Sequence, residues 1–447
     1  MSIGNTMNEK VVPQVMKFVN LKGIQALKDG ILFTLPLNIV GSIFLLIACF
    51  PSVTFTNFCA SVFGENWTDP LFKVQGATMN IIAIVSVIGI AYTYAKNEGY
   101  EPLSAGITAL VVFLITTPNW TMFTPAEGAD AVKVGDVLPI GWAGGQGMIA
   151  AIIVGICVGA AYSWFMKKDI RIKMPDGVPS GVVNAFSAII PAAVMFVVAD
   201  IIYIIFKFAL NTTMIEWIYR VIQTPLQGVS DSPFGVIVIA FCIPFLWFFG
   251  IHGSNVIGGI VQGLLIANTN ENALLQKAGT LDLAHGAHIV TQQFLDNFIN
   301  MTGAGETIGL VLCMLFIAKS AQYKQLGKLS SAPGLFNINE PILFGMPIVM
   351  NPIMAIPFMI VPLINGLLLY ALIAAQILPP MGGLMPPWTT PPILSGFLIG
   401  GWKYALAQIV LLVVATAIYL PFFKKADAMS YANEIAAQTA SENGVQA

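Results

Sequence analysis

Long apolar runs separated by short polar segments dominate the chain. A helix needs about 20 mostly apolar residues to cross a bilayer. The pattern therefore predicts an all-α polytopic membrane protein with about ten transmembrane helices. The candidate spans are 31–51, 72–95, 103–117, 142–166, 182–210, 234–251, 255–267, 305–319, 352–378 and 403–423.

Three further segments break the pattern. Segment 331–352 is apolar at both ends, but glycines, prolines and the carboxylate Glu340 interrupt it, so we expect a re-entrant hairpin. The proline-rich segment 378–402 predicts a second irregular or re-entrant element. Segment 211–233 is too polar to span and carries apolar residues at helical spacing, which predicts an amphipathic interfacial helix.

These breaks suggest four parts. Residues 1–210 hold simple spans with few charges, and we expect a scaffold and dimerisation half there. Residues 211–233 form the amphipathic connector, 234–423 a transport half with the substrate site, and 424–447 a cytoplasmic tail. Lysine and arginine collect in alternate loops and near both ends, which predicts that both termini are cytoplasmic.

Composition excludes several classes of function. The chain has 447 residues, of which 57% are hydrophobic and 9% charged, against about 25% charged residues in soluble domains. A net charge of −2 gives no basic surface for nucleic acid. The five cysteines form no C-x-x-C pair, and no G-x-x-x-x-G-K-[ST] loop is present. We therefore expect no ATP-driven motor, no metal and no cofactor.

Glu340 is the first candidate for a polar ligand contact. Transporters build substrate sites from interrupted membrane segments, and Asn337 and Asn339 flank this carboxylate. We include both asparagines as candidate sugar contacts. The alternative is a carboxylate at the tip of a cytoplasmic loop.

His252 is the second candidate. It lies between two glycines at the end of an apolar span, in the sequence GIHGSN, which Asn255 completes. Ionisable residues inside a membrane are functional candidates, and a neutral imidazole can donate and accept hydrogen bonds, as a hydroxyl ligand requires. A structural histidine bonded to the backbone is the alternative.

The polar loop 268–303 contains a His-x-x-His spacing at His285 and His288. Zinc would need a third ligand, and no H-E-x-x-H pattern is present. We favour a polar loop that borders a cavity, with Asn297 or Asn300 in contact with a sugar.

Trp247 and Trp388 are candidates for an aromatic platform. An aromatic face packs against the apolar face of a pyranose, while polar side chains bind the hydroxyl edges. Both tryptophans could instead anchor the chain at the membrane interface.

The segments GIHGSN at 250–255, FNINEPILFGMPIVMNP at 336–352 and MPPW at 385–388 resemble enzyme IIC, the membrane subunit of the sugar phosphotransferase system. The resemblance is to the lactose/cellobiose/N,N'-diacetylchitobiose family and covers essentially the whole chain. The asparagine–glutamate–proline core is its most specific part.

The resemblance implies a permease in the bacterial cytoplasmic membrane that carries a β-linked disaccharide inward for phosphorylation at its C6 hydroxyl. The phosphoryl group would come from a cysteine of a separate enzyme IIB, charged through enzyme IIA. His252 and Glu340 would hold the C6 hydroxyl, and Trp247 and Trp388 would lie against the sugar rings. The resemblance also implies a homodimer and an elevator-like movement of the second half.

Two other functions remain open at this point. Glu340 could be the coupling carboxylate of a proton-driven secondary sugar transporter, or the protein could be a membrane sensor or scaffold without transport. Among β-disaccharides we favour cellobiose or diacetylchitobiose, because no IIB domain is fused to the chain.

Overall fold

The computed structural model describes residues 17, 20–48, 53–123, 132–175, 177–249, 252–346, 348 and 351–445. The described chain separates into two compact units. Unit A consists of the described parts of Gln14–Ser230 and Gly259–Lys277. Unit B consists of the described parts of Asp231–Gly258 and Ala278–Ala447. Helix α15 (Gly253–Lys277) begins in unit B and ends in unit A.

Unit A is helical apart from one exposed hairpin, in which β1 (Trp120–Phe123) pairs antiparallel with β2 (Val132–Gly135). Its other elements are α3 (Lys22–Ile31), η2 (Leu32–Thr34), α4 (Leu35–Ala48), α5 (Val53–Phe63), α6 (Asp69–Met79), α7 (Ile82–Asn97), α8 (Pro102–Thr116), α9 (Ile140–Ala143), η3 (Gly145–Gly147), α10 (Met148–Lys167), α11 (Ser180–Ala209), α12 (Met214–Ile218), η4 (Tyr219–Gln223) and α13 (Thr224–Ser230).

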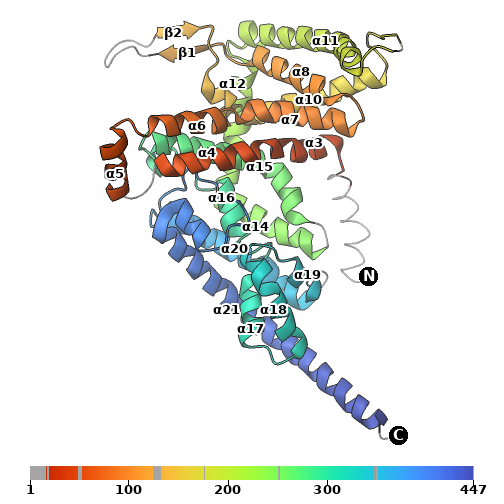
Figure 1. The fold of residues 1–447 in the computed structure, drawn as a ribbon, viewed down its shortest axis with the longest axis vertical. Coiled ribbons are helices and arrows are strands. Elements are labelled where there is room, and N and C mark those ends of the chain that lie inside the picture. Colours follow the sequence, from red (N-terminus) through yellow and green to blue (C-terminus); the bar gives the residue numbers. More distant parts are fainter. Residues whose placement is uncertain are drawn as a thin grey trace. The chain divides into compact units, whose positions relative to one another are not determined.

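Helix α7 lies at the centre of unit A and packs against α3 and α10 (Figure 1). Small residues permit the close approach: a Cβ on Gly30 would lie 2.5 Å from the Ile90 Cα. Gly155 of α10 packs against the Ile90 side chain in the same way. Close contact between small residues stabilises apolar helices in a membrane, where lipid is as apolar as the side chains.

Unit B contains α14 (Pro233–Phe248), the first turns of α15, and two long apolar helices. Irregular backbone connects these elements at 278–291, 300–307, 336–339 and 375–393. The remaining elements are η5 (Leu283–His285), α16 (Gln292–Phe294), η6 (Leu295–Ile299), α17 (Ile308–Phe316), α18 (Ala321–Leu335), α19 (Glu340–Gly345), α20 (Pro352–Ala374) and α21 (Leu394–Val445), which is interrupted at Gly400 and Gly401.

The predicted fold class is confirmed. Within the described ranges, six helices are long and apolar enough to cross a membrane, or seven if the consecutive helices 214–230 and 233–248 count as one broken span. The predicted total of about ten spans stays a prediction. The six are Lys22–Leu45, Asp69–Asn97, Gly145–Lys167, Ser180–Ala209, Ile353–Ala374 and Leu394–Ala436.

Two segments differ in detail from the sequence interpretation. Residues 268–277, expected in a loop, continue helix α15, and 331–335 belong to α18 rather than to a hairpin. Segment 259–277 packs in unit A, although the sequence placed it in the transport half. The functional division into scaffold and transport halves stays a prediction.

We predict that Gly30→Ala destabilises the protein. The new methyl group would overlap the backbone of Ile90, and overpacking of a tight contact costs about 1–3 kcal/mol. Thermal unfolding of the purified protein in detergent measures the loss. Gly181→Ala is the matched control, because a Cβ there would meet no atom within 4 Å. Equal melting temperatures for the two variants would contradict the packing argument.

Candidate functional site

Asn337 joins three segments of unit B through one side chain. Its Oδ1 accepts a hydrogen bond from the Thr302 N–H at 2.6 Å. Its Nδ2 donates to the carbonyls of Trp388 and Thr390, the latter at 3.0 Å. The residue is buried and has a left-handed backbone (φ 64°), which asparagine tolerates better than most residues. Asn337 therefore fixes the loops that carry the other candidates.

Asn339 has a similar structural position. Its Nδ2 donates to the Ala304 carbonyl at 2.7 Å and to the Thr307 hydroxyl at 3.1 Å. Gly303 lies so close that an added Cβ would be 2.3 Å from the Asn339 Cγ. In this structure both asparagines thus bind protein groups, and their predicted contact with a sugar stays a prediction.

Glu340 differs from the two buried asparagines because it is exposed. It is the first residue of α19, directly after Asn339, and its side chain is exposed. Pro341 follows in the first turn, where a missing N–H costs no helical hydrogen bond. The inward asparagines and the outward carboxylate make Glu340 accessible on a backbone that is held firmly in place.

His252 and Trp247 lie together. Their ring centroids are 4.4 Å apart with planes at 47°, and His252 is exposed while Trp247 is buried. The Trp247 indole nitrogen is buried and has no hydrogen-bond partner within the described part of the chain. The backbone at Gly253 passes directly against the Ile243 carbonyl of α14, where an added Cβ would lie 2.0 Å from the oxygen.

A chain of contacts connects the histidine segment to the glutamate segment inside unit B. The Ser254 hydroxyl contacts the Asn300 Oδ1 at 3.5 Å. The Gly303 N–H donates to the Asn300 carbonyl at 2.9 Å, and the loop at 302–307 is bound by Asn337 and Asn339 as described. Hydrogen bonds within unit B thus link the backbone segments that carry His252, Glu340 and Trp388, while a direct contact between the His252 and Glu340 side chains stays a prediction.

Trp388 is exposed and sits on a tethered loop. Gln293 donates to the carbonyls of Gly382 and Leu384 at 2.6 and 2.9 Å. Gln408 of α21 accepts from the backbone N–H groups of Ile393 and Gly396. These two buried glutamines hold the proline-rich segment from both sides. Gln293 belongs to the polar loop that the sequence singled out, whereas Gln408 was missed.

The remaining candidates are less favourably placed. Asn297 is buried, and its side-chain amide has no hydrogen-bond partner among the described residues. The side chain of Asn255 lies outside the described residues. The two histidines of the His-x-x-His spacing pair with different carboxylates, His285 with Asp282 at 2.8 Å and His288 with Asp231 at 3.0 Å. Within the described ranges, no group of three or more potential metal ligands occurs.

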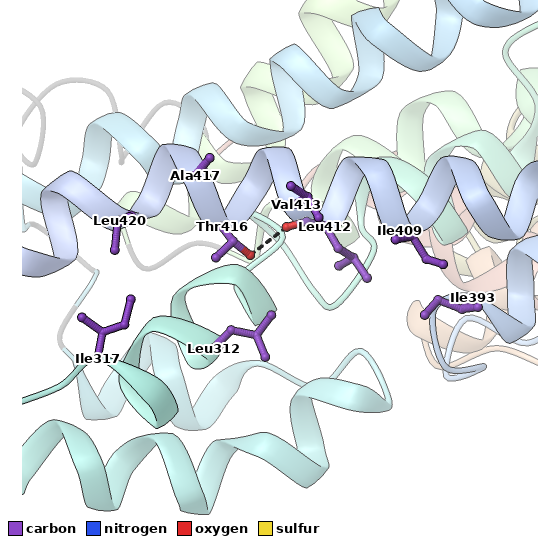
Figure 2. A pocket seen from close by; sticks show the side chains of 9 residues that line it. All are labelled: Leu312, Ile317, Ile393, Ile409, Leu412, Val413, Thr416, Ala417 and Leu420. Carbon is purple, nitrogen blue, oxygen red and sulfur yellow. Dashed lines mark hydrogen bonds between the residues drawn. The ribbon is translucent and has the colours of Figure 1, made fainter.

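A cavity of about 430 Å³ opens between α17 and α21 (Figure 2). Its lining is aliphatic apart from Thr416, whose hydroxyl already donates to the Leu412 carbonyl at 2.7 Å. Sugars need several convergent hydrogen-bonding groups. This cavity therefore does not suit a sugar, and the exposed side chains at 252, 340 and 388 remain the better candidates.

Comparisons with known proteins identify the family. The family model "Phosphotransferase system, EIIC" matches residues 28–362. The chain is 37% identical to a "PTS system cellobiose-specific EIIC component" of Geobacillus stearothermophilus, with 97% of this chain and 96% of the relative covered. It is 36% identical to the "Lichenan permease IIC component" of Bacillus subtilis, with 95% and 94% covered.

A solved structure is similar to this chain over nearly the whole length of both. The chain matches the crystal structure of the transporter ChbC, described as the IIC component from the N,N'-diacetylchitobiose-specific phosphotransferase system. The TM-score is 0.91 at 35% identity, with 96% of this chain and 99% of that chain covered. The chain therefore belongs to the enzyme IIC family of the phosphotransferase system.

Proposed function

We propose that the protein is a phosphotransferase-system permease for a β-linked disaccharide of the cellobiose or diacetylchitobiose type. The named specificities of similar proteins support this substrate class. The observation that carries the proposal is the Trp247 indole N–H, which is buried beside the exposed His252 and has no acceptor among the residues that the structure describes. Buried donors in native proteins almost always have a partner, and a sugar hydroxyl would supply one here.

In the proposed mechanism, Glu340 and His252 hold the C6 hydroxyl of the sugar. The sugar oxygen attacks the phosphorus of a phosphocysteine on enzyme IIB, and the sulfur–phosphorus bond breaks to leave a thiolate. The hydroxyl proton passes to the Glu340 carboxylate, which acts as general base. Phosphoryl transfer depends mainly on positioning and electrostatics, so a firmly held backbone around Glu340 favours it. Enzyme IIA would recharge enzyme IIB.

The sugar rings would lie against the exposed face of Trp388, and Asn337 would set the position of that tryptophan through its carbonyl. We assign Asn337 and Asn339 to positioning, because their amide nitrogens are bonded to protein oxygens. Asn255 and Asn297 remain candidate sugar contacts in this proposal.

We further propose that the protein is a homodimer of the bacterial cytoplasmic membrane with both termini in the cytoplasm. Helix α11 of unit A supports a membrane or subunit contact, because large aliphatic and aromatic side chains are exposed along most of its length. In this view unit A contributes the scaffold and unit B carries the sugar, in an elevator-like movement.

We predict that Glu340→Gln retains folding but lowers sugar phosphorylation by about 10²–10⁴-fold, the usual contribution of a general base. The assay measures sugar phosphate in membrane vesicles supplied with phosphorylated enzyme IIB. Glu65→Gln is the matched control, since Glu65 is an exposed glutamate in unit A, remote in sequence from the site. Normal phosphorylation by Glu340→Gln would remove Glu340 from the mechanism.

Trp388→Ala should weaken disaccharide binding about tenfold, equivalent to about 1.4 kcal/mol, because the apolar ring face loses its platform. Binding isotherms of the purified protein against a panel of β-disaccharides measure the change. Trp402→Ala removes another exposed tryptophan of the same unit and should leave the affinity unchanged. A similar loss of affinity in both variants would indicate that the tryptophans anchor the protein at the membrane interface and that Trp388 does not bind the sugar directly.

Vesicles also separate the proposal from proton-coupled transport. We expect accumulation of sugar phosphate only when enzyme IIB and a phosphoryl donor are present. Uptake of unmodified sugar driven by a pH gradient alone would support the proton-coupled alternative, and sugar binding without flux would support a sensor.

A further inference from the structure

Glu306 is a carboxyl group in unit B that the proposed mechanism does not use. It lies in the loop between η6 and α17, and its side chain is fully buried (0% exposed). Its partner is Asn365 of α20, also buried, whose Nδ2 donates to the Glu306 Oε2. In the described residues, Glu306 forms no ion pair with a lysine or arginine.

Two oxygens at this contact are left without donors. Among the residues that the structure describes, neither the Glu306 Oε1 nor the Asn365 Oδ1 has a hydrogen-bond partner, although both are buried. Flipping the Asn365 amide would not solve the problem. Its Nδ2 also donates to the Leu411 carbonyl at 3.0 Å, and a carbonyl can only accept, so the nitrogen must face it.

One added proton satisfies both oxygens. A protonated carboxyl has one O–H donor in addition to its acceptor oxygen. We propose that Glu306 is a neutral carboxylic acid whose Oε1–H donates to the Asn365 Oδ1, which completes a cyclic acid–amide pair with the Asn365 Nδ2–H. An ionised Glu306 would instead leave a negative charge and two acceptors buried with one donor, which is strongly unfavourable.

The titratable side chain beside this pair is consistent with a neutral Glu306. Tyr419 of α21 donates its hydroxyl to the neighbouring Gly305 carbonyl at 2.7 Å. A protonated tyrosine is uncharged and supplies no cation to balance a carboxylate.

The pair has a positioning role for the site. Loop 302–307 contains four residues with positive φ, Thr302, Gly303, Gly305 and Glu306, so its conformation must be held by outside contacts. Asn337 and Asn339 bind one side of this loop, and Tyr419 and Asn365 bind the other. The neutral pair thus connects the backbone that supports Glu340 to the long helices α20 and α21. This role rests on the proposed function, whereas the protonation state of Glu306 does not.

Infrared spectroscopy tests the protonation state directly. The purified protein at neutral pH should show the carbonyl band of a protonated carboxyl, and this band should be absent from Glu306→Gln. The Glu65→Gln control should instead lose the bands of an ionised carboxylate. Loss of carboxylate bands in Glu306→Gln would overturn the proposal. If Glu306→Gln does not accumulate, Glu306→Asp serves for the assignment, since it should shift the protonated band.

Transport kinetics test the positioning role. Glu306→Gln can form an amide–amide pair with the same two hydrogen bonds, so we expect sugar phosphorylation within about twofold of wild type. Glu306→Ala loses both bonds and should raise KM about tenfold. A folded Glu306→Gln without activity would show that the charge is needed and would overturn the proposal. If the wild-type protein yields no sugar phosphate in this assay, the proposed function is refuted. The infrared measurement of the Glu306 protonation state does not depend on that outcome.

Discussion

The structure of unit B depends on one constraint, which is that irregular backbone among apolar helices must find its hydrogen bonds within the protein. Asn337 meets this requirement at three points at once, by accepting from Thr302 and donating to the carbonyls of Trp388 and Thr390. Gln408 does the same for the end of the proline-rich segment. Without these amides, the loops that carry the exposed candidates would have unpaired polar groups at membrane depth.

The same constraint explains why Glu340 is accessible. Successive residues of the motif alternate in direction, with Asn337 and Asn339 buried and Ile338 and Glu340 exposed. The two asparagines bind the loop at 302–307, and the carboxylate is thereby directed outward at the start of α19. Positioning of a reactive group by buried neighbours is a common requirement of binding sites. Residues 337–340 thus combine two side chains that bind the neighbouring loop with one exposed carboxylate.

Sequence reasoning located the fold class and the motif segments, but it could not assign the asparagines. An asparagine beside a glutamate offers the same polar atoms to a ligand or to backbone, and the backbone partners at 302–307 and 388–390 are far away in sequence. Helix α15 was expected to end near Ala267 because polar residues follow. It continues because Thr269 and Asn270 bond back to the carbonyls of Leu265 and Ile266 and Gln227 binds Asn268. Gln227 and Asn268 are far apart in sequence, so their contact is not evident from the sequence alone.

Glu306 was missed for a related reason, since a single glutamate at the start of an apolar run resembles an ordinary helix start. In the structure, two of the glutamates of unit B lie in contrasting surroundings: Glu340 is exposed, whereas Glu306 is enclosed by Asn365 and the loop at 302–307. An accessible carboxylate can take a proton from a ligand hydroxyl, which is the role that we propose for Glu340. A buried carboxyl that keeps its proton, as we propose for Glu306, instead serves as a fixed hydrogen-bonding group. In this proposal the same side-chain type has a chemical role at one position and a structural role at the other.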